Sequence, residues 1–145
     1  MKTIVKERII KKSREYLYNK WTTKEGLNSF FSADNLVEIF PGGKYEIYFT
    51  KDLSVKNRGS EKCKVLSFIP NRVFSFTWNV PPQFKELRES EKFTWVVIEF
   101  IKADNNTLVR LSNIGYPEDE AWESVFKYFD KAWEMVMNSL VKSCD

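Results

Sequence analysis

The stretch that decides the fold is residues 117–140, PEDEAWESVFKYFDKAWEMVMNSL. Its apolar side chains recur every three or four residues, the spacing of an amphipathic helix of about six turns. Pro117 suits the first helical position, and the acidic residues after it favour the positive end of the helix dipole. One face of this helix should therefore pack against the rest of the protein. Its apolar stripe consists of Trp122, Val125, Phe126, Phe129, Trp133, Val136, Met137 and Leu140.

Upstream of this helix, between residues 36 and 115, apolar and polar residues alternate as they do in strands. The turn-forming stretches PGG, PN and ADNN each separate two such segments. Consecutive hairpins predict an antiparallel sheet. The polar, proline-led stretch 80–92 reads as a long loop. The expected strands are residues 36–40 with 45–50, residues 59–69 with 72–79, and residues 93–102 with 107–114.

The first part of the chain adds a strand over residues 3–10 and two short helices. Ser13 and Thr23 are suitable N-caps for these helices, the second of which should carry Leu27, Phe30 and Phe31. The element order predicts an α+β fold, a curved antiparallel sheet of about six to seven strands wrapped around the long C-terminal helix. Because the sheet bends around the helix, a cavity can remain between them.

The glycines of FPGGKYEIYF, residues 40–49, raise the alternative of a phosphate-binding loop. That motif needs glycine five residues before its last glycine and Ser or Thr after its lysine. Glu38 and Tyr45 occupy those two positions here. We therefore interpret Pro41, Gly42 and Gly43 as a turn between strands.

Composition limits the function classes. The 145 residues suit a single domain, 1–145, and a net charge of +3 with dispersed Lys and Arg does not indicate a nucleic-acid surface. No segment approaches 18 apolar residues, so we expect a cytoplasmic protein without membrane contact. The chain has no histidine, and Cys63 and Cys144 lie far apart, so neither a metal site, a disulfide nor a cofactor is indicated. Aromatic residues make up 16%, which suits either a Phe-rich core or an aromatic-lined cavity.

Several stretches, in order along nearly the whole chain, resemble the activator-of-heat-shock-protein-90-ATPase homologue (AHSA-like) family. They are REYLYNKWTTKEGLNSFF, FPGGKYEIYF, VLSFIPNRVFSFTW, IEFIKADNNTLVRLSNIGY and FDKAWEMVMNSL. This family belongs to the START and birch-pollen-allergen helix-grip (SRPBCC) superfamily. The resemblance implies a helix-grip fold with a hydrophobic pocket between the sheet and the C-terminal helix. It leaves the activity open, since superfamily members include lipid carriers, cyclases and chaperone partners.

Strand alternation indicates which side chains face the helix. Glu99 and Arg110 should lie opposite each other on the outer face of the sheet. Apolar pockets contain few polar groups, and the polar candidates here are Tyr45, Glu61, Asn113 and the Trp78 indole. Plain core packing is the alternative for each aromatic side chain, and Cys63 should be an inert buried thiol. The residues expected to line a cavity are Tyr45, Ile47, Phe49, Glu61, Cys63, Phe76, Trp78, Val96, Asn113, Trp122, Phe126 and Phe129.

Three functions fit these observations. The first is a binding protein for a small apolar or lipid-like ligand, without covalent chemistry or catalytic residues. The second is a protein-interaction module that contacts a chaperone ATPase or another protein, as a monomer or homodimer. The third is a cyclase or hydrolase that uses Glu61 or Glu99 as base and Tyr45 as acid.

Overall fold

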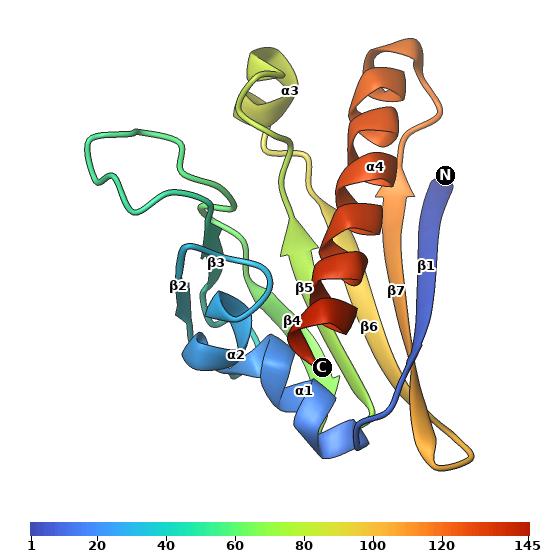
Figure 1. The fold of residues 1–145 in the computed structure, drawn as a ribbon. Coiled ribbons are helices and arrows are strands. Elements are labelled where there is room, and N and C mark those ends of the chain that lie inside the picture. The colour runs from blue at the N-terminus through green and yellow to red at the C-terminus, as the bar shows by residue number, and fades with distance from the viewer.

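The computed structural model describes residues 1–145 and contains a five-stranded sheet, a two-stranded hairpin and four helices (Figure 1). The large sheet has the order β1-β7-β6-β5-β4, and all its strand pairs are antiparallel. The predicted fold class is confirmed, although two of the seven strands form a separate hairpin. The elements are β1 (Lys2–Ile10), α1 (Arg14–Thr22), α2 (Lys24–Asn28), β2 (Asp34–Val37), β3 (Tyr45–Tyr48), β4 (Val65–Ile69), β5 (Val73–Trp78), α3 (Lys85–Glu89), β6 (Thr94–Ala103), β7 (Asn106–Tyr116) and α4 (Glu120–Ser143).

Helix α4 lies across one face of the large sheet, which we call the inner face (Figure 1). The helix begins at Glu120 and not at Pro117 as predicted, because Asp119 is its N-cap residue. The Asp119 carboxylate accepts a hydrogen bond from the Trp122 amide at 3.2 Å, as an N-cap does. The predicted apolar stripe is the face turned to the sheet. Its buried members are Trp122, Val125, Phe129, Trp133, Met137 and Leu140.

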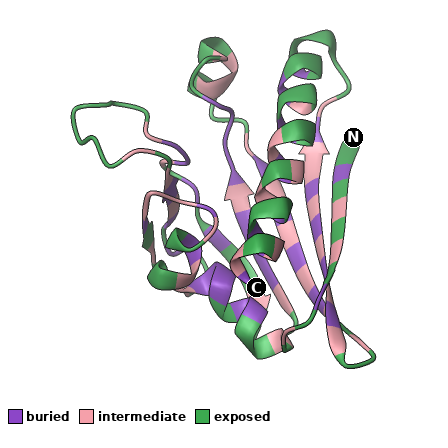
Figure 2. Ribbon diagram, viewed as in Figure 1, coloured by how far each residue is buried: buried purple, intermediate pink, exposed green.

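Burial alternates along the central strands, as Figure 2 shows for β6 and β7. Side chains of one parity form the core under α4, and those of the other parity lie on the outer face. Glu99 and Arg110 are opposite each other on that outer face, as predicted. The inward-facing residues expected on these two strands are all buried. They are Val96, Ile98, Phe100, Val109, Leu111 and Asn113.

Ion pairs hold α4 over the β1 edge of the sheet. The ammonium group of Lys6 on β1 lies 3.0 Å from the Asp130 carboxylate and 3.3 Å from that of Glu134. Arg8, the next inward-facing residue of β1, also pairs with Glu134 and donates to the Asn138 amide oxygen at 2.8 Å. Because α4 is held over this edge, it reaches the end of β5 only through side chains such as Phe129 and Trp133.

Helices α1 and α2 cover the inner face beyond the C-terminal end of α4. Ser13 and Thr23 cap them as predicted, by accepting hydrogen bonds from the amides of Tyr16 and Gly26. Helix α2 ends at Asn28, so Phe30 and Phe31 lie after it and not within it, contrary to the prediction. This displacement brings both rings against Trp21, with centroid distances of 5.0 and 5.7 Å.

The Pro41-Gly42-Gly43 stretch is a turn between β2 and β3, as predicted. Gly42 has a φ of +86°, which glycine adopts without steric cost. A Cβ atom on Gly43 would lie 2.1 Å from the Glu38 carbonyl oxygen, so this position also requires glycine. The turn passes close to β4, where the Gly42 amide donates to the Val65 carbonyl at 2.8 Å.

Several other predicted boundaries were wrong. The strand expected over residues 36–40 is β2, Asp34–Val37. The strand expected over residues 59–69 begins only at Val65, because the residues before it form turns and two isolated bridges, Gly59 with Tyr48 and Lys64 with Lys44. Glu61 stabilises these turns: its carboxylate accepts from the amides of Arg58 and Gly59 at 2.7 and 2.9 Å. The stretch 80–92, expected to be a loop, contains the short helix α3, whose KELRE sequence is rich in helix-forming residues.

Candidate ligand-binding pocket

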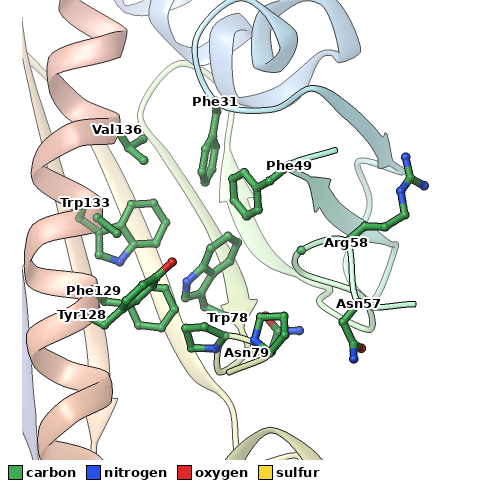
Figure 3. Close-up of a pocket in the computed structure, with 14 residues that line it drawn as sticks. Phe31, Phe49, Asn57, Arg58, Trp78, Asn79, Tyr128, Phe129, Trp133 and Val136 are labelled. Atoms are coloured by element: carbon green, nitrogen blue, oxygen red, sulfur yellow. The ribbon is translucent and has the colours of Figure 1, made fainter. Parts of the chain in front are cut away.

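A pocket of about 320 Å³ opens between the end of β5 and helix α4 (Figure 3). Its mouth lies between the β3–β4 connection and the segment that leads into α3. Most of its wall is aromatic or aliphatic, and the polar lining residues lie near the rim. The lining residues are Phe31, Phe49, Asn57, Arg58, Gly59, Trp78, Asn79, Pro81, Pro82, Tyr128, Phe129, Ala132, Trp133 and Val136.

Two tryptophans that contact each other form one wall of the pocket. Trp78 comes from the last position of β5, and Trp133 comes from α4, with ring centroids 5.0 Å apart. Phe129, one helical turn before Trp133, adds a ring whose centroid is 6.1 Å from that of Trp78. Phe31 closes the inner end, 5.9 Å from Trp78 and 5.7 Å from Trp133. These four rings contact one another, and the pocket lies beside this aromatic cluster.

Asn113 fixes the orientation of Trp133. Its amide oxygen accepts hydrogen bonds from the Trp133 indole nitrogen at 2.8 Å and from the Tyr116 hydroxyl. Its amide nitrogen donates to the Thr94 hydroxyl at 3.0 Å and to the Trp95 carbonyl at 3.1 Å. Every polar atom of the Asn113 side chain is thus paired. This residue supports the pocket wall from behind and does not line the pocket.

Trp78 lacks the corresponding support. Its side chain is buried, and its indole Nε1 has no hydrogen-bond partner. In Figure 3 the nitrogen-bearing edge of this ring is turned toward the α4 wall, where Phe129 lies. One unpaired hydrogen-bond donor therefore lies within the pocket wall, shielded from the open space by the neighbouring side chains.

An ion pair between Glu61 and Arg88 joins the two segments of the rim. The Arg88 guanidinium lies 3.0 Å from the Glu61 carboxylate and donates to the carbonyls of Val80 and Gly59 at 2.6 and 2.9 Å. Its side chain is only 11% exposed. Arg58, in contrast, contributes little charge to the pocket, because its side chain points away from it (Figure 3). Its guanidinium stacks over the Tyr48 ring at 4.2 Å. The rim is held by polar contacts, while the interior is apolar.

A second hollow, of about 700 Å³, adjoins the rim on the side of α3 and shares Asn57, Asn79 and Pro82 with the pocket. Its wall is mainly charged, and Glu61 and Arg88 belong to it. It is a polar surface depression that none of the four rings of the aromatic cluster lines.

The structure separates the groups that an enzyme of the third kind would need together. Tyr45 is buried and its hydroxyl donates to the Trp21 carbonyl at 2.6 Å, and burial raises its pKa well above the usual value. Glu61 is paired with Arg88 at the rim, and Glu99 lies on the outer face beside Arg110. Burial also raises the pKa of the Cys63 thiol to about 12, so this thiol is protonated at neutral pH.

Of the twelve side chains expected to line a cavity, the pocket brings together Phe49, Trp78 and Phe129. Trp122 and Phe126 pack instead against Tyr116 near the start of α4, with centroid distances of 6.3 and 5.2 Å. Asn113 lies behind the wall and Glu61 lies at the rim. The remaining five are buried in the core away from the pocket: Tyr45, Ile47, Cys63, Phe76 and Val96.

The sequence interpretation missed Trp133 and Phe31, which form the other walls. Trp133 was in the predicted stripe of α4, one turn after Phe129, so its spacing was the signal that could have identified it. Phe31 could not be placed, because it lies outside the helix expected to carry it. The sequence assigned the rim prolines, Pro81 and Pro82, to a loop and did not indicate that they line the pocket.

Comparison with known proteins bears directly on this architecture. The family model described as activator of Hsp90 ATPase homolog 1-like protein matches residues 11–144. The chain belongs to this family. The resemblance seen in the sequence is thereby confirmed. No curated protein matches the sequence of this family member.

Solved structures share the fold of this family member. The protein MLL2253 from Mesorhizobium loti is 20% identical, with a TM-score of 0.78 over 98% of this chain and 96% of that one. The Aha1 dimer from Colwellia psychrerythraea is 23% identical, with a TM-score of 0.78 over 99% of this chain and 96% of that one. CalU16 from Micromonospora echinospora is 15% identical, with a TM-score of 0.73 over 99% and 76%. At these identities the likeness establishes the fold alone.

No helix of this family member has the length and apolar character needed to cross a membrane.

Proposed function

We propose that this protein binds a small apolar molecule in the pocket that Trp78, Phe129 and Trp133 line, without covalent chemistry. The observation that carries the proposal is an open space of about 320 Å³ with aromatic walls. Ligand pockets in proteins begin at about 300 Å³, and one water molecule in the liquid takes about 30 Å³. The pocket thus has room for a ligand of roughly the size of a bicyclic hydrocarbon.

The chemistry of the wall favours an uncharged ligand. The one strongly charged lining residue, Arg58, turns its guanidinium away and donates it to the Thr50 carbonyl at 2.9 Å. Burial of apolar surface contributes about 25 cal/mol per Å², and flat rings stack well against Trp and Phe side chains. A compact molecule with a flat apolar part is therefore the ligand class that this wall fits.

The test is to fill the pocket from α4. Ala132 lines the pocket, whereas Ala121, on the same helix, is exposed and remote from it. Calorimetric titration with indane should give saturable binding to the natural protein and to Ala121→Phe. Binding to Ala132→Phe should be at least about tenfold weaker, since the new ring occupies the ligand's space. Equal binding to both variants, or no binding to any of the proteins, would contradict the proposal.

A second candidate function is contact with another protein through the outer face of the large sheet. Outer faces of antiparallel sheets are commonly polar, but Val5 and Ile9 on β1 are 51% and 65% exposed here. Half-buried Leu108 and Ile101 extend the apolar surface at Ile9, and Val97 lies near Val5 on the other side of the ion-paired row Glu7, Arg110 and Glu99. Exposed apolar patches of this kind mark interaction surfaces.

A second copy of the chain is the first partner to examine, since the Colwellia protein is described as a dimer. Sedimentation equilibrium should show association that Ile9→Lys abolishes and that the pocket variant Ala132→Phe leaves unchanged. A monomer at all concentrations would turn attention to a chaperone ATPase, the partner that the family description suggests. Absence of ATPase stimulation as well would remove this second candidate.

A further inference from the structure

The unpaired indole nitrogen of Trp78 points to a more specific ligand. Trp78 is 4% exposed, and its Nε1 has no hydrogen-bond partner in the protein. Buried polar groups are nearly always paired, so an unpaired donor at the wall of a pocket needs an explanation. An acceptor atom on the ligand would supply the missing partner.

A comparison with Trp133 and Trp21 shows how the Trp78 indole nitrogen differs from theirs. Trp133 lines the same pocket and contacts the Trp78 ring, yet its Nε1 donates to the Asn113 amide oxygen at 2.8 Å. Trp21 also has an unpaired Nε1, but it lies behind Phe30 and Phe31 and does not line the pocket. Trp78 alone combines an unpaired indole donor with a place in the wall.

We infer that the ligand carries an uncharged oxygen acceptor, such as a ketone carbonyl, that accepts a hydrogen bond from Trp78 Nε1. This inference rests on the proposed function, since it names the ligand class for the same pocket. The acceptor is uncharged because no cationic side chain is directed at the wall beside Trp78. The apolar remainder of the ligand lies against the aromatic walls.

Binding in this mode requires a local movement. Trp78 Nε1 is shielded from water in this structure. Phe129 is the neighbour that we expect to uncover it, because its ring meets that of Trp78 at 63° and also lines the pocket. A turn of the Phe129 side chain toward the mouth would admit the ligand oxygen to the indole N–H.

The experiment compares two ligands of the same shape, 1-indanone with its carbonyl and indane without it. Calorimetry gives the ratio of their affinities for the natural protein, for Trp78→Phe and for Trp133→Phe. Both substitutions shrink one wall equally, but only the first removes the unpaired donor. We expect the preference for 1-indanone to fall about fivefold to tenfold in Trp78→Phe and to stay unchanged in Trp133→Phe, as the net value of one hydrogen bond predicts.

The outcomes separate the two proposals. If neither ligand binds the natural protein, the proposed function fails. If both bind but the preference is the same in all three proteins, the function stands and the assignment to Trp78 is overturned. An equal fall in both variants would also overturn it, because a change of shape would then explain the preference.

A measurement on the natural protein covers the case in which Trp78→Phe does not fold. Hydrogen bonding moves an indole N–H proton resonance downfield. The Trp78 N–H should move downfield with 1-indanone and not with indane. Movement in the same direction and by the same amount with both ligands would overturn the inference.

Discussion

Strand β5 passes through two regions that have similar side chains and different packing. Phe74 and Phe76 belong to a closed core, where the Tyr45 ring lies 5.0 and 4.4 Å from theirs. Trp78, two residues further on the same face, faces the open pocket. The closed core is the cluster of Trp21, Tyr45, Cys63, Phe74 and Phe76, all fully buried.

The difference arises from what covers the strand and not from the strand itself. Helix α1 and the β2–β3 hairpin bring Trp21 and Tyr45 over the first half of β5, and the hydrogen bond between them seals that region. Ion pairs to β1 hold α4 over the opposite edge of the sheet, so the end of β5 is covered only in part. Phe31 lies at the border, in contact with Trp21 on one side and Trp78 on the other.

The largest expected effect is the difference in stability loss between a truncation in the closed core and one in the pocket. Phe76→Ala removes a fully buried ring from the closed core and should lower the free energy of unfolding by about 3–5 kcal/mol. Phe49→Ala removes a pocket ring that is 53% exposed, and should cost less than about 1 kcal/mol. Urea unfolding measures both. Equal losses would show that the pocket is packed like the core.

The second effect concerns the support of the pocket wall. Asn113→Leu leaves the Trp133 indole and the Tyr116 hydroxyl without an acceptor, and each buried orphan costs about 1–3 kcal/mol. We expect a loss of at least about 2 kcal/mol in urea unfolding and an altered Trp133 fluorescence. Ser112→Val, on the outward side of the same strand, is the matched control. A loss no greater than that of the control would show that Asn113 does not support the wall.

The third effect tests the rim. Arg88→Met removes the guanidinium donor from the Val80 and Gly59 carbonyls and from the Glu61 carboxylate, which keeps only its two backbone amide donors. Hydrogen bonds to charged groups contribute about 1.5–3 kcal/mol. Hydrogen exchange should accelerate in α3 and at the Gly59 amide, with no change in the closed core. Lys85→Met, on the exposed face of α3, is the control. Uniform acceleration would mean that the ion pair stabilises the whole fold and not the rim.

The smallest effect is a pH dependence confined to the closed core. Burial raises the pKa of the Cys63 thiol to about 12 from a usual value of 9.0. Between these values the unfolded chain binds fewer protons than the folded one, so stability is complete below pH 9 and falls as the pH rises. From pH 9 to 10 this group should remove about 1 kcal/mol, which Cys63→Ala should abolish. Identical slopes for the two proteins would contradict the burial of this thiol.

The sequence predicted the fold and part of the site, because the direction of a side chain on a strand follows from local alternation. Period-two alternation assigned Val96, Ile98 and Asn113 to the inner face, because a strand side chain has only two directions available. The same alternation could not distinguish Phe76 from Trp78, since both face inward and only the covering elements differ. Helix α2 ends before Phe31, and this tertiary detail decides the inner end of the pocket. Glu61 was wrongly assigned to a strand. The turn that contains it is stabilised by its own carboxylate and by Arg88, which is distant in sequence, so the local pattern did not indicate a turn.

The most direct test is an indane titration of the ¹⁵N-labelled protein, followed through the indole N–H signals of its five tryptophans. The signals of Trp78 and Trp133 should shift in a saturable manner, while that of Trp21 in the closed core should stay in place. That pattern would establish that the end of β5 holds an open apolar site beside a filled one. A shift of Trp21 as large as that of Trp78, or no saturable shift of any tryptophan, would contradict the account.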